Sequence, residues 1–310
     1  MKSNKKFLQS VAALLILIFH LWIPVSDWIG EEFIIKIGYV GVDIFFFVSA
    51  YSLATRDIEY GKLLKNRILN IYGKYVLLAI IAAIVKNMSL IRFLKIVSFI
   101  EFFEKGGGSF LWFVPAIMLF YILFPLFIKW KWRYKSLLVL ILWLIVSMIL
   151  EQLTGYTKLF IFTNRIPVML AGYVLAKGLK LPSWIYPVSL LTGLITLYQF
   201  GYRLKLNQPI AEFYFIFGTL IAVGLYGISK YIKDRKVWHN LSSGTLELYA
   251  LQMICGAKLA MYIYRYTGYK LLTNVLVIVI LVAVAYVIAV VWRKVLDRLS
   301  MMLAGRSNVH

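Results

Sequence analysis

Long hydrophobic segments divide this 310-residue chain along almost its whole length. A helix needs about 20 mainly apolar residues to cross a bilayer core of about 30 Å, because it rises 1.5 Å per residue. We count ten segments of about this length, and we therefore expect an all-α polytopic membrane protein formed by one domain over residues 1–310. The segments cover residues 7–28, 34–55, 71–88, 109–128, 136–153, 157–176, 182–201, 208–229, 244–264 and 271–292.

Composition supports this class. Apolar residues make up 62% of the chain, whereas soluble domains contain about 45–50%. The formal net charge is +21, but the basic residues are spread over short loops instead of forming one patch. We therefore expect a lipid bilayer as a partner, and we do not expect a nucleic acid.

The distribution of basic residues predicts an orientation. Cytoplasmic loops of membrane proteins are enriched in Lys and Arg. If the N-terminus is cytoplasmic, the inner segments contain 22 of the 34 Lys and Arg residues. An even number of spans then places both termini in the cytoplasm. We expect a multi-pass protein of the plasma or inner cell membrane, with its basic first segment retained as a span and not cleaved as a signal peptide.

The region between the third and fourth segments has a different pattern. Lys86 is expected to end the third segment early. Residues 89–104 then have the pattern of an amphipathic helix at the membrane surface. The three glycines at 106–108 predict a hinge before the fourth segment.

Two ionisable residues occupy adjacent hydrophobic segments. His20 lies in the first segment and Asp43 in the second, at similar predicted depths in two antiparallel neighbours. A carboxylate bonded to one imidazole nitrogen fixes the tautomer and leaves the other nitrogen as a general base. The alternative is that His20 and Asp43 only hold two helices together. Charged side chains are costly inside a bilayer and are commonly functional, which favours the catalytic interpretation.

Further polar and aromatic candidates lie in later segments. Arg165 lies in the sixth segment, where it must pair or face water, and Pro167 can open the helix beside it. Glu247 is a candidate partner, although the predicted orientation places it nearer the inner side. Trp112 and Tyr121 are candidates to line a cleft for a sugar, while interfacial belts are the usual location of such aromatic residues.

The first two segments resemble the opening of a known family. Residues 7–22 and 38–52 are similar to the acyltransferase-3 family of integral membrane O-acyltransferases, with His20 at the family's first-span histidine and the string GYVGVDIFF at residues 38–46. The similarity continues through most of the chain. Further matching elements lie at residues 65–75, 111–126, 165–172 and 246–249.

This resemblance implies a reaction. A family member would use acetyl-CoA as the acyl donor and would acylate a hydroxyl of a cell-surface or envelope glycan or of its lipid-linked precursor. It implies that His20 is the base, with Asp43 as its orienting partner. Arg67, with Lys65 and Lys74, is our candidate for the donor's phosphates, since arginine binds phosphate in a bidentate manner. The usual excess of positive charge inside is the alternative for these three residues.

The chain departs from the family pattern at several positions. Gln9 replaces the first-span arginine eleven residues before His20, on the same face of a helix. Asn70 replaces the second arginine of the basic segment, and Ala50 and Gln252 replace a glycine and a histidine. We expect no metal, because no His, Cys and carboxylate residues occur together at ligand spacing.

Two other classes of protein fit part of the pattern. A transporter or flippase of a lipid-linked saccharide, or a non-catalytic family member, would fit ten spans with buried charges equally well. A polyprenyl-phosphate glycosyltransferase is expected to carry an acidic, metal-binding loop at the membrane face, and the sequence has none. Dependence on His20 and on coenzyme A separates the enzyme from the transporter.

Overall fold

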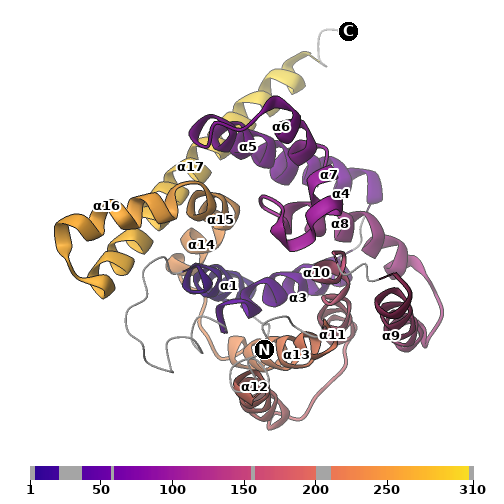
Figure 1. The fold of residues 1–310 in the computed structure, drawn as a ribbon. Helices are drawn as coiled ribbons and strands as arrows, with labels where there is room; N and C mark the ends of the chain where they lie inside the picture. Colours follow the sequence, from indigo (N-terminus) through magenta and orange to yellow (C-terminus); the bar gives the residue numbers. More distant parts are fainter. Residues whose placement is uncertain (1–3, 21–36, 57–58, 155–157, 200–210, 307–310) are drawn as a thin grey trace.

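The computed structural model describes residues 4–20, 37–56, 59–154, 158–199 and 211–306, and every regular element in this part of the chain is a helix (Figure 1). The predicted all-α class is therefore confirmed. The first half contains α1 (Lys5–Phe19), α3 (Val40–Ala54), α4 (Tyr60–Arg67), the π-helical turn η1 (Ile68–Tyr72), α5 (Gly73–Val85), α6 (Leu90–Val97), α7 (Ile100–Lys105), the 3-10 turn η2 (Gly106–Gly108) and α8 (Phe113–Lys129). The second half contains α9 (Lys135–Thr154), α10 (Phe160–Thr163), α11 (Ile166–Ala176), α12 (Ile185–Thr196), α13 (Ala211–Ser229), α14 (Lys236–Ser243), α15 (Thr245–Leu251), the π-helical turn η4 (Gln252–Gly256), α16 (Ala257–Thr267) and α17 (Lys270–Arg306).

Each of the ten predicted segments contains at least one helix, but the helices differ in length. Within the described residues, three continuous helices are long and apolar enough to cross a membrane: Tyr60–Val85, Thr245–Thr267 and Lys270–Val295. A fourth candidate is the pair Ile100–Gly108 and Phe113–Lys129, which is bent by 119°. Other apolar helices are shorter, so ten crossings and two cytoplasmic termini remain predictions.

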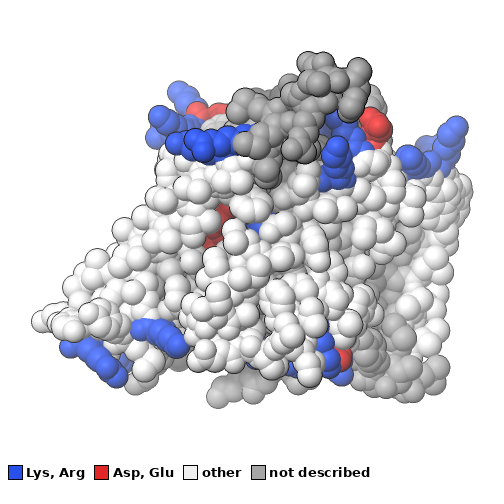
Figure 2. Space-filling view, turned by 90° about the horizontal axis from the view of Figure 1, so that it is seen from above, with Lys and Arg blue, Asp and Glu red and all other residues white. Residues whose placement is uncertain are grey.

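The surface has the charge distribution of a membrane protein. Figure 2 shows Lys and Arg side chains gathered along two opposite edges, with a broad band between them in which few charged atoms are visible. Many large apolar side chains are exposed, among them Ile84, Leu90, Ile91 and Leu271, each exposed by more than 60%. Such a surface is stable when lipid chains cover it.

The third predicted segment begins earlier than expected. Helix continues from Tyr60 through η1 to Val85, whereas the sequence predicted a basic loop before residue 71. The strong helix formers Leu and Lys in α4 account for this start. The end agrees with the prediction, because Lys86 is the C-cap of α5.

Residues 89–104 form two helices where the sequence predicted one. Phe99 has a φ of 65° and so separates α6 from α7. Ile96 and Phe102 are buried, while Leu90 and Ile91 are each exposed by about 70%, so each helix has a buried and an outward side. The bend of 119° lies between Ile100–Gly108 and Phe113–Lys129, so the chain turns at residues 109–112, directly after the three glycines and not at them.

Helix α3 is the centre of the molecule. It packs against α1, α8, α11 and α13 and lies in the middle of the helix assembly (Figure 1). Eleven of its fifteen residues are buried, including Asp43. A helix that is apolar on all sides is expected to be enclosed by others, and this enclosure positions the candidate site.

Candidate functional site

Glycines bring α1 and α3 into close contact. A Cβ atom on Gly38 would lie 2.3 Å from the carbonyl oxygen of Leu15, and one on Gly41 would lie 2.5 Å from that of Ala12. No larger residue fits at either position without moving a helix backbone. Small residues at such positions allow two membrane helices to approach closely.

His20 lies at the end of α1. It is the C-cap of a helix that ends at Phe19, whereas the sequence predicted a continuous helix to residue 28; residues 21–36 lie outside the described part. The His20 Nδ1 atom donates a hydrogen bond to the carbonyl oxygen of Ile16 at 3.0 Å. Because a carbonyl oxygen only accepts, Nδ1 carries the proton of the neutral ring, and Nε2 has the free lone pair.

Asp43 has a different partner from the predicted one. Its Oδ1 lies 3.1 Å from Nη1 of Arg165, and the two side chains are only 1% and 0% exposed. The Tyr39 ring lies 4.8 Å from the Arg165 guanidinium carbon. The structure thus replaces the predicted His20–Asp43 pair: a backbone carbonyl orients His20, and Arg165 neutralises Asp43.

The Asp43–Arg165 pair joins three helices. Arg165 lies in the break between α10 and α11, two residues before Pro167, where the sequence predicted an opened helix. On the other side, a Cβ on Gly218 of α13 would lie 2.6 Å from Oδ2 of Asp43. The carboxylate of α3 is therefore packed between α11 and α13.

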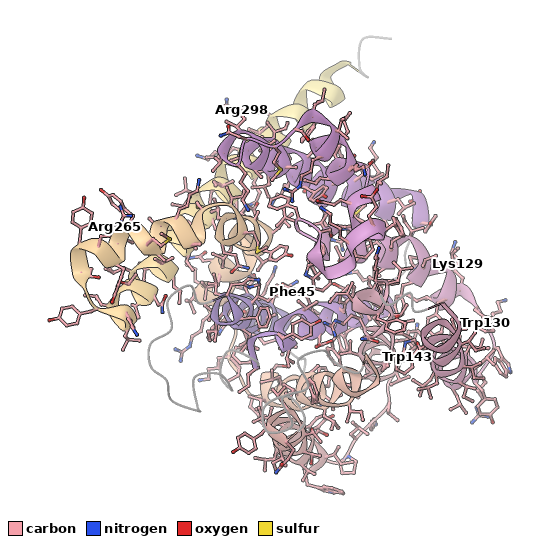
Figure 3. The ribbon with its side chains drawn as sticks, viewed as in Figure 1. Phe45, Lys129, Trp130, Trp143, Arg265 and Arg298 are labelled. Carbon is pink, nitrogen blue, oxygen red and sulfur yellow. The ribbon has the colours of Figure 1, made fainter. Side chains whose placement is uncertain are left out.

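A polar cavity of about 240 Å³ lies on the opposite side of α3. Phe45 and Ser49 of α3 line it together with Gln9 and Ile16 of α1. Figure 3 shows Phe45 in the middle of the helix assembly, while Lys129 and Arg265 lie at its periphery. His20 does not line the cavity, but it follows Ile16, which does, by one helical turn. The remaining wall is formed by Arg67, Asn70, Ile71, Lys74, Phe113, Val114, Ile117, Tyr121, Ser243, Thr245, Leu246, Glu247 and Tyr249.

Arg67 is held over an aromatic ring in this cavity. Its guanidinium carbon lies 4.4 Å from the centre of the Tyr121 ring, a favourable cation–π arrangement. The Tyr121 hydroxyl is hydrogen-bonded to Ser49 Oγ at 3.2 Å. The buried Nε of Arg67 has no hydrogen-bond partner among the described residues, so it can still donate to a ligand.

Lys74 and Glu247 form a second ion pair in the cavity. Lys74 Nζ donates to Oε1 of Glu247, whose side chain is 2% exposed. Glu247 is therefore not the partner of Arg165 that the sequence suggested, in agreement with its predicted position nearer the inner side. Its Oε2 is buried without a partner in the described part of the chain, which leaves one carboxylate oxygen able to accept a hydrogen bond.

A comparison with models of known protein families identifies the family of this chain. A family model described as an acyltransferase domain, that of the acyltransferase-3 family, matches residues 6–293. The chain belongs to the acyltransferase-3 family. No curated protein and no solved structure is significantly similar to it.

Four of the predicted site residues line the cavity: Arg67, Lys74, Tyr121 and Glu247. The other five, His20, Asp43, Arg165, Lys65 and Trp112, do not line it. Lys65 is on the exposed face of α4, and Trp112 packs edge-on against Phe113 with ring centres 6.4 Å apart. Two positions that depart from the family pattern, Gln9 and Asn70, do line the cavity.

The sequence did not single out Ser243 and Thr245 for the cavity. Both line the cavity because they flank Gly244, where α14 ends and α15 begins. No local motif marks them. Among the described residues, no three His, Cys, Asp or Glu side chains come together at a spacing that could hold a metal ion.

Proposed function

We propose that the protein is a membrane O-acyltransferase that moves an acetyl group from acetyl-CoA to a hydroxyl of a cell-surface or envelope glycan or its lipid-linked precursor. The observation that carries the proposal is the polar cavity. In a chain of the acyltransferase-3 family, one cavity is lined by a stacked arginine, a carboxylate with a free oxygen and several hydroxyl and amide groups.

The donor's phosphates would bind at Arg67. The guanidinium is positioned by Tyr121 and retains a free buried donor. Lys74 contributes less than the sequence suggested, because Glu247 already offsets its charge. Lys65 lies on the exposed face of the same helix as Arg67 and would act at longer range, in a manner sensitive to salt.

The acceptor would be a polyol. Ser49, Thr245 and Gln9 offer neutral hydrogen-bonding groups, and Glu247 Oε2 can accept from a hydroxyl. The Tyr121 ring adds an aromatic wall. A few convergent polar groups within an otherwise apolar lining are typical of small-molecule sites, and this set suits a sugar better than an apolar substrate.

His20 would be the general base. Its Nε2 takes the proton of the acceptor hydroxyl while the hydroxyl oxygen bonds to the thioester carbonyl carbon. The carbon–sulfur bond then breaks, and the coenzyme A thiolate leaves and takes up the proton from His20. The Ile16 carbonyl, which accepts from Nδ1, stabilises the imidazolium during this step. The Asp43–Arg165 pair lies on the side of α3 opposite the cavity, and there it would hold α3, and with it the cavity wall, in position.

Thioester turnover tests this function. Purified protein in nanodiscs receives acetyl-CoA with and without a crude glycan acceptor, and release of free thiol is followed. We expect turnover by the wild type and a loss of at least about 100-fold in His20→Ala, the usual contribution of a general base. His239→Ala is the matched control, because His239 is exposed and bonded to Asp234 at 2.9 Å.

Two results would contradict the proposal. Equal turnover in His20→Ala and wild type would exclude His20 as the base. No turnover and no coenzyme A binding in any variant would favour a transporter of a lipid-linked saccharide or a non-catalytic family member.

A further inference from the structure

A second cavity, of about 730 Å³, lies where α1 begins and α3 ends. These two helices and α13 pack against one another, and Figure 1 shows them side by side in the assembly. No residue lines both this cavity and the polar cavity beside Arg67. We call it the basic cavity, and it is lined by Asn4, Lys5, Lys6, Tyr51, Thr55, Arg56, Ile232 and Asp234.

Two cations in the basic cavity are available to a ligand. Lys6 lies at the start of α1, and Arg56 directly follows the C-cap of α3. Neither side chain forms a hydrogen bond or an ion pair with another residue in the described part of the chain. Lys5 is already engaged, since its Nζ lies 5.1 Å from the centre of the Tyr51 ring. A ligand can therefore bind to Lys6 and Arg56 without breaking an existing pair.

The cations around Lys6 repel one another. Desolvation lowers the pKa of Lys6, and the guanidinium groups of Arg293 and Arg56 lower it further, while Asp234 raises it. Lys6 thus lies within electrostatic range of two arginines from two other helices. The usual excess of positive charge inside accounts for basic residues at this edge, but it does not require them to line a cavity. An anion between Lys6 and Arg56 would relieve this repulsion.

The carboxylate in the lining offsets this charge only in part. Both carboxylate oxygens of Asp234 lie 2.9 Å from Nε2 of His239, so Asp234 is already engaged. A phosphate monoester carries a charge of about −1.5 to −2 near neutral pH, which matches the two available cations. Arg56 can bind two phosphate oxygens at once, and Lys6 can add a third bond.

The lining favours a soluble ligand over a lipid. Only Tyr51 and Ile232 contribute mainly apolar side chains to the basic cavity, and Lys5 covers one face of the Tyr51 ring. A lipid chain needs an extended apolar wall, and these two residues do not provide one. The volume is within the range of small-molecule sites, so it holds a phosphate together with the molecule that carries it.

We propose that the basic cavity binds a soluble phosphate monoester, at a site distinct from the donor and acceptor sites of the proposed function. Lys6 and Arg56 bind the phosphate oxygens. The rest of the ligand occupies the space between α1, α3 and the residues that follow α13. Binding at this site needs no turnover, so it can be measured whether or not the protein transfers an acyl group.

Isothermal titration calorimetry in detergent tests the site, with glycerol 3-phosphate as the probe. The protein carries Arg67→Gln, so that the donor-phosphate contact of the proposed function is absent. We expect binding in this background. Lys6→Gln and Arg56→Gln should each weaken it about tenfold or more, because a hydrogen bond to a charged group contributes about a factor of ten or more.

Lys233→Gln is the matched control. Lys233 is exposed and lies between two lining residues, but it does not line the cavity. Its loss should change the affinity by less than about threefold, because exposed charges contribute little. No binding in the Arg67→Gln background, or equal weakening by Lys233→Gln and Arg56→Gln, would overturn the proposal.

Two further measurements separate this site from its alternatives. Phosphatidylglycerol that is retained by the wild type and lost in Arg56→Gln would assign the cavity to a lipid head group and overturn the soluble source. With Arg67 intact, Arg56→Gln should leave the half-saturating concentration of acetyl-CoA in thioester turnover unchanged. A rise would make the cavity part of the donor site and overturn the proposal. Binding of glycerol 3-phosphate without any thioester turnover would support this site and count against the proposed function alone.

Discussion

At the scale of single residues, two ion pairs organise the charges inside the protein. Asp43 and Arg165 form one on one side of α3, and Lys74 and Glu247 form the other in the polar cavity. The first is wholly buried and joins α3 to α11. The second leaves a carboxylate oxygen facing the cavity. We therefore assign the first pair to structure and the second to ligand binding.

Removing one member of the buried pair should destabilise the protein. Asp43→Asn leaves the Arg165 charge uncompensated at 0% exposure, which costs about 3–5 kcal/mol in comparable buried pairs. Thermal unfolding in detergent should show a clear fall in Tm. Asp234→Asn is the control, since Asp234 is 64% exposed in its pair with His239 and exposed pairs contribute little. Equal shifts in the two variants would contradict the structural role.

The sequence singled out the four residues that form the two ion pairs, but it did not predict how they pair. Asp43, Arg165 and Glu247 were identified because charges in apolar segments are unusual, whereas Lys74 was identified as part of the basic segment that resembles the family. Their pairing depends on helix rotation and depth, and a continuous first span to residue 28 placed His20 beside Asp43. The end of α1 at Phe19 and the break before Ile166 set the actual partners.

At the scale of helices, glycines determine how closely α1 and α3 approach. The GYVG string places Gly38 and Gly41 one turn apart, against the backbone of α1. This contact was predictable from sequence, because two small residues at helical spacing in an apolar segment are a recognised packing signal. The bend at Phe99 was not predictable, since phenylalanine rarely adopts a positive φ.

Two glycine substitutions should have opposite effects. In Gly41→Ala the new Cβ would lie 2.5 Å from the Ala12 carbonyl oxygen, and overpacking of this kind costs about 1–3 kcal/mol. In Gly61→Ala no atom lies within 4 Å, and an exposed helical site should gain up to about 1 kcal/mol. Thermal unfolding of both variants measures the difference. A stabilised Gly41→Ala would show that α1 and α3 are not in close contact.

At the scale of the whole molecule, two charged edges enclose an apolar band (Figure 2). Ten hydrophobic segments predicted a membrane protein, and each of those segments contains at least part of a helix. The number of membrane crossings depends also on the length of each helix. Several helices contain only 10–17 residues in their described part, and sequence hydropathy does not register such breaks.

Cysteine labelling tests the predicted topology. In a Cys255→Ser background, which removes the single cysteine, Lys180→Cys should be labelled only from the cytoplasmic side. Tyr269→Cys should be labelled only from outside, because the ninth predicted segment ends shortly before it. Both positions follow the ends of predicted segments, and Tyr269 is 72% exposed. Labelling of both residues from the same side would contradict ten spans with cytoplasmic termini.

Transfer of a labelled acetyl group tests the central claim most directly. Nanodiscs with wild type, His20→Ala or His239→Ala receive acetyl-CoA labelled in the acetyl group together with a lipid-linked saccharide fraction. We predict label in the saccharide as an ester that hydroxylamine removes, equal in wild type and His239→Ala and at least about 100-fold lower in His20→Ala. Label that remains in coenzyme A with the wild type, or an equal yield of ester with His20→Ala, would contradict the assignment of an O-acyltransferase with His20 as its base.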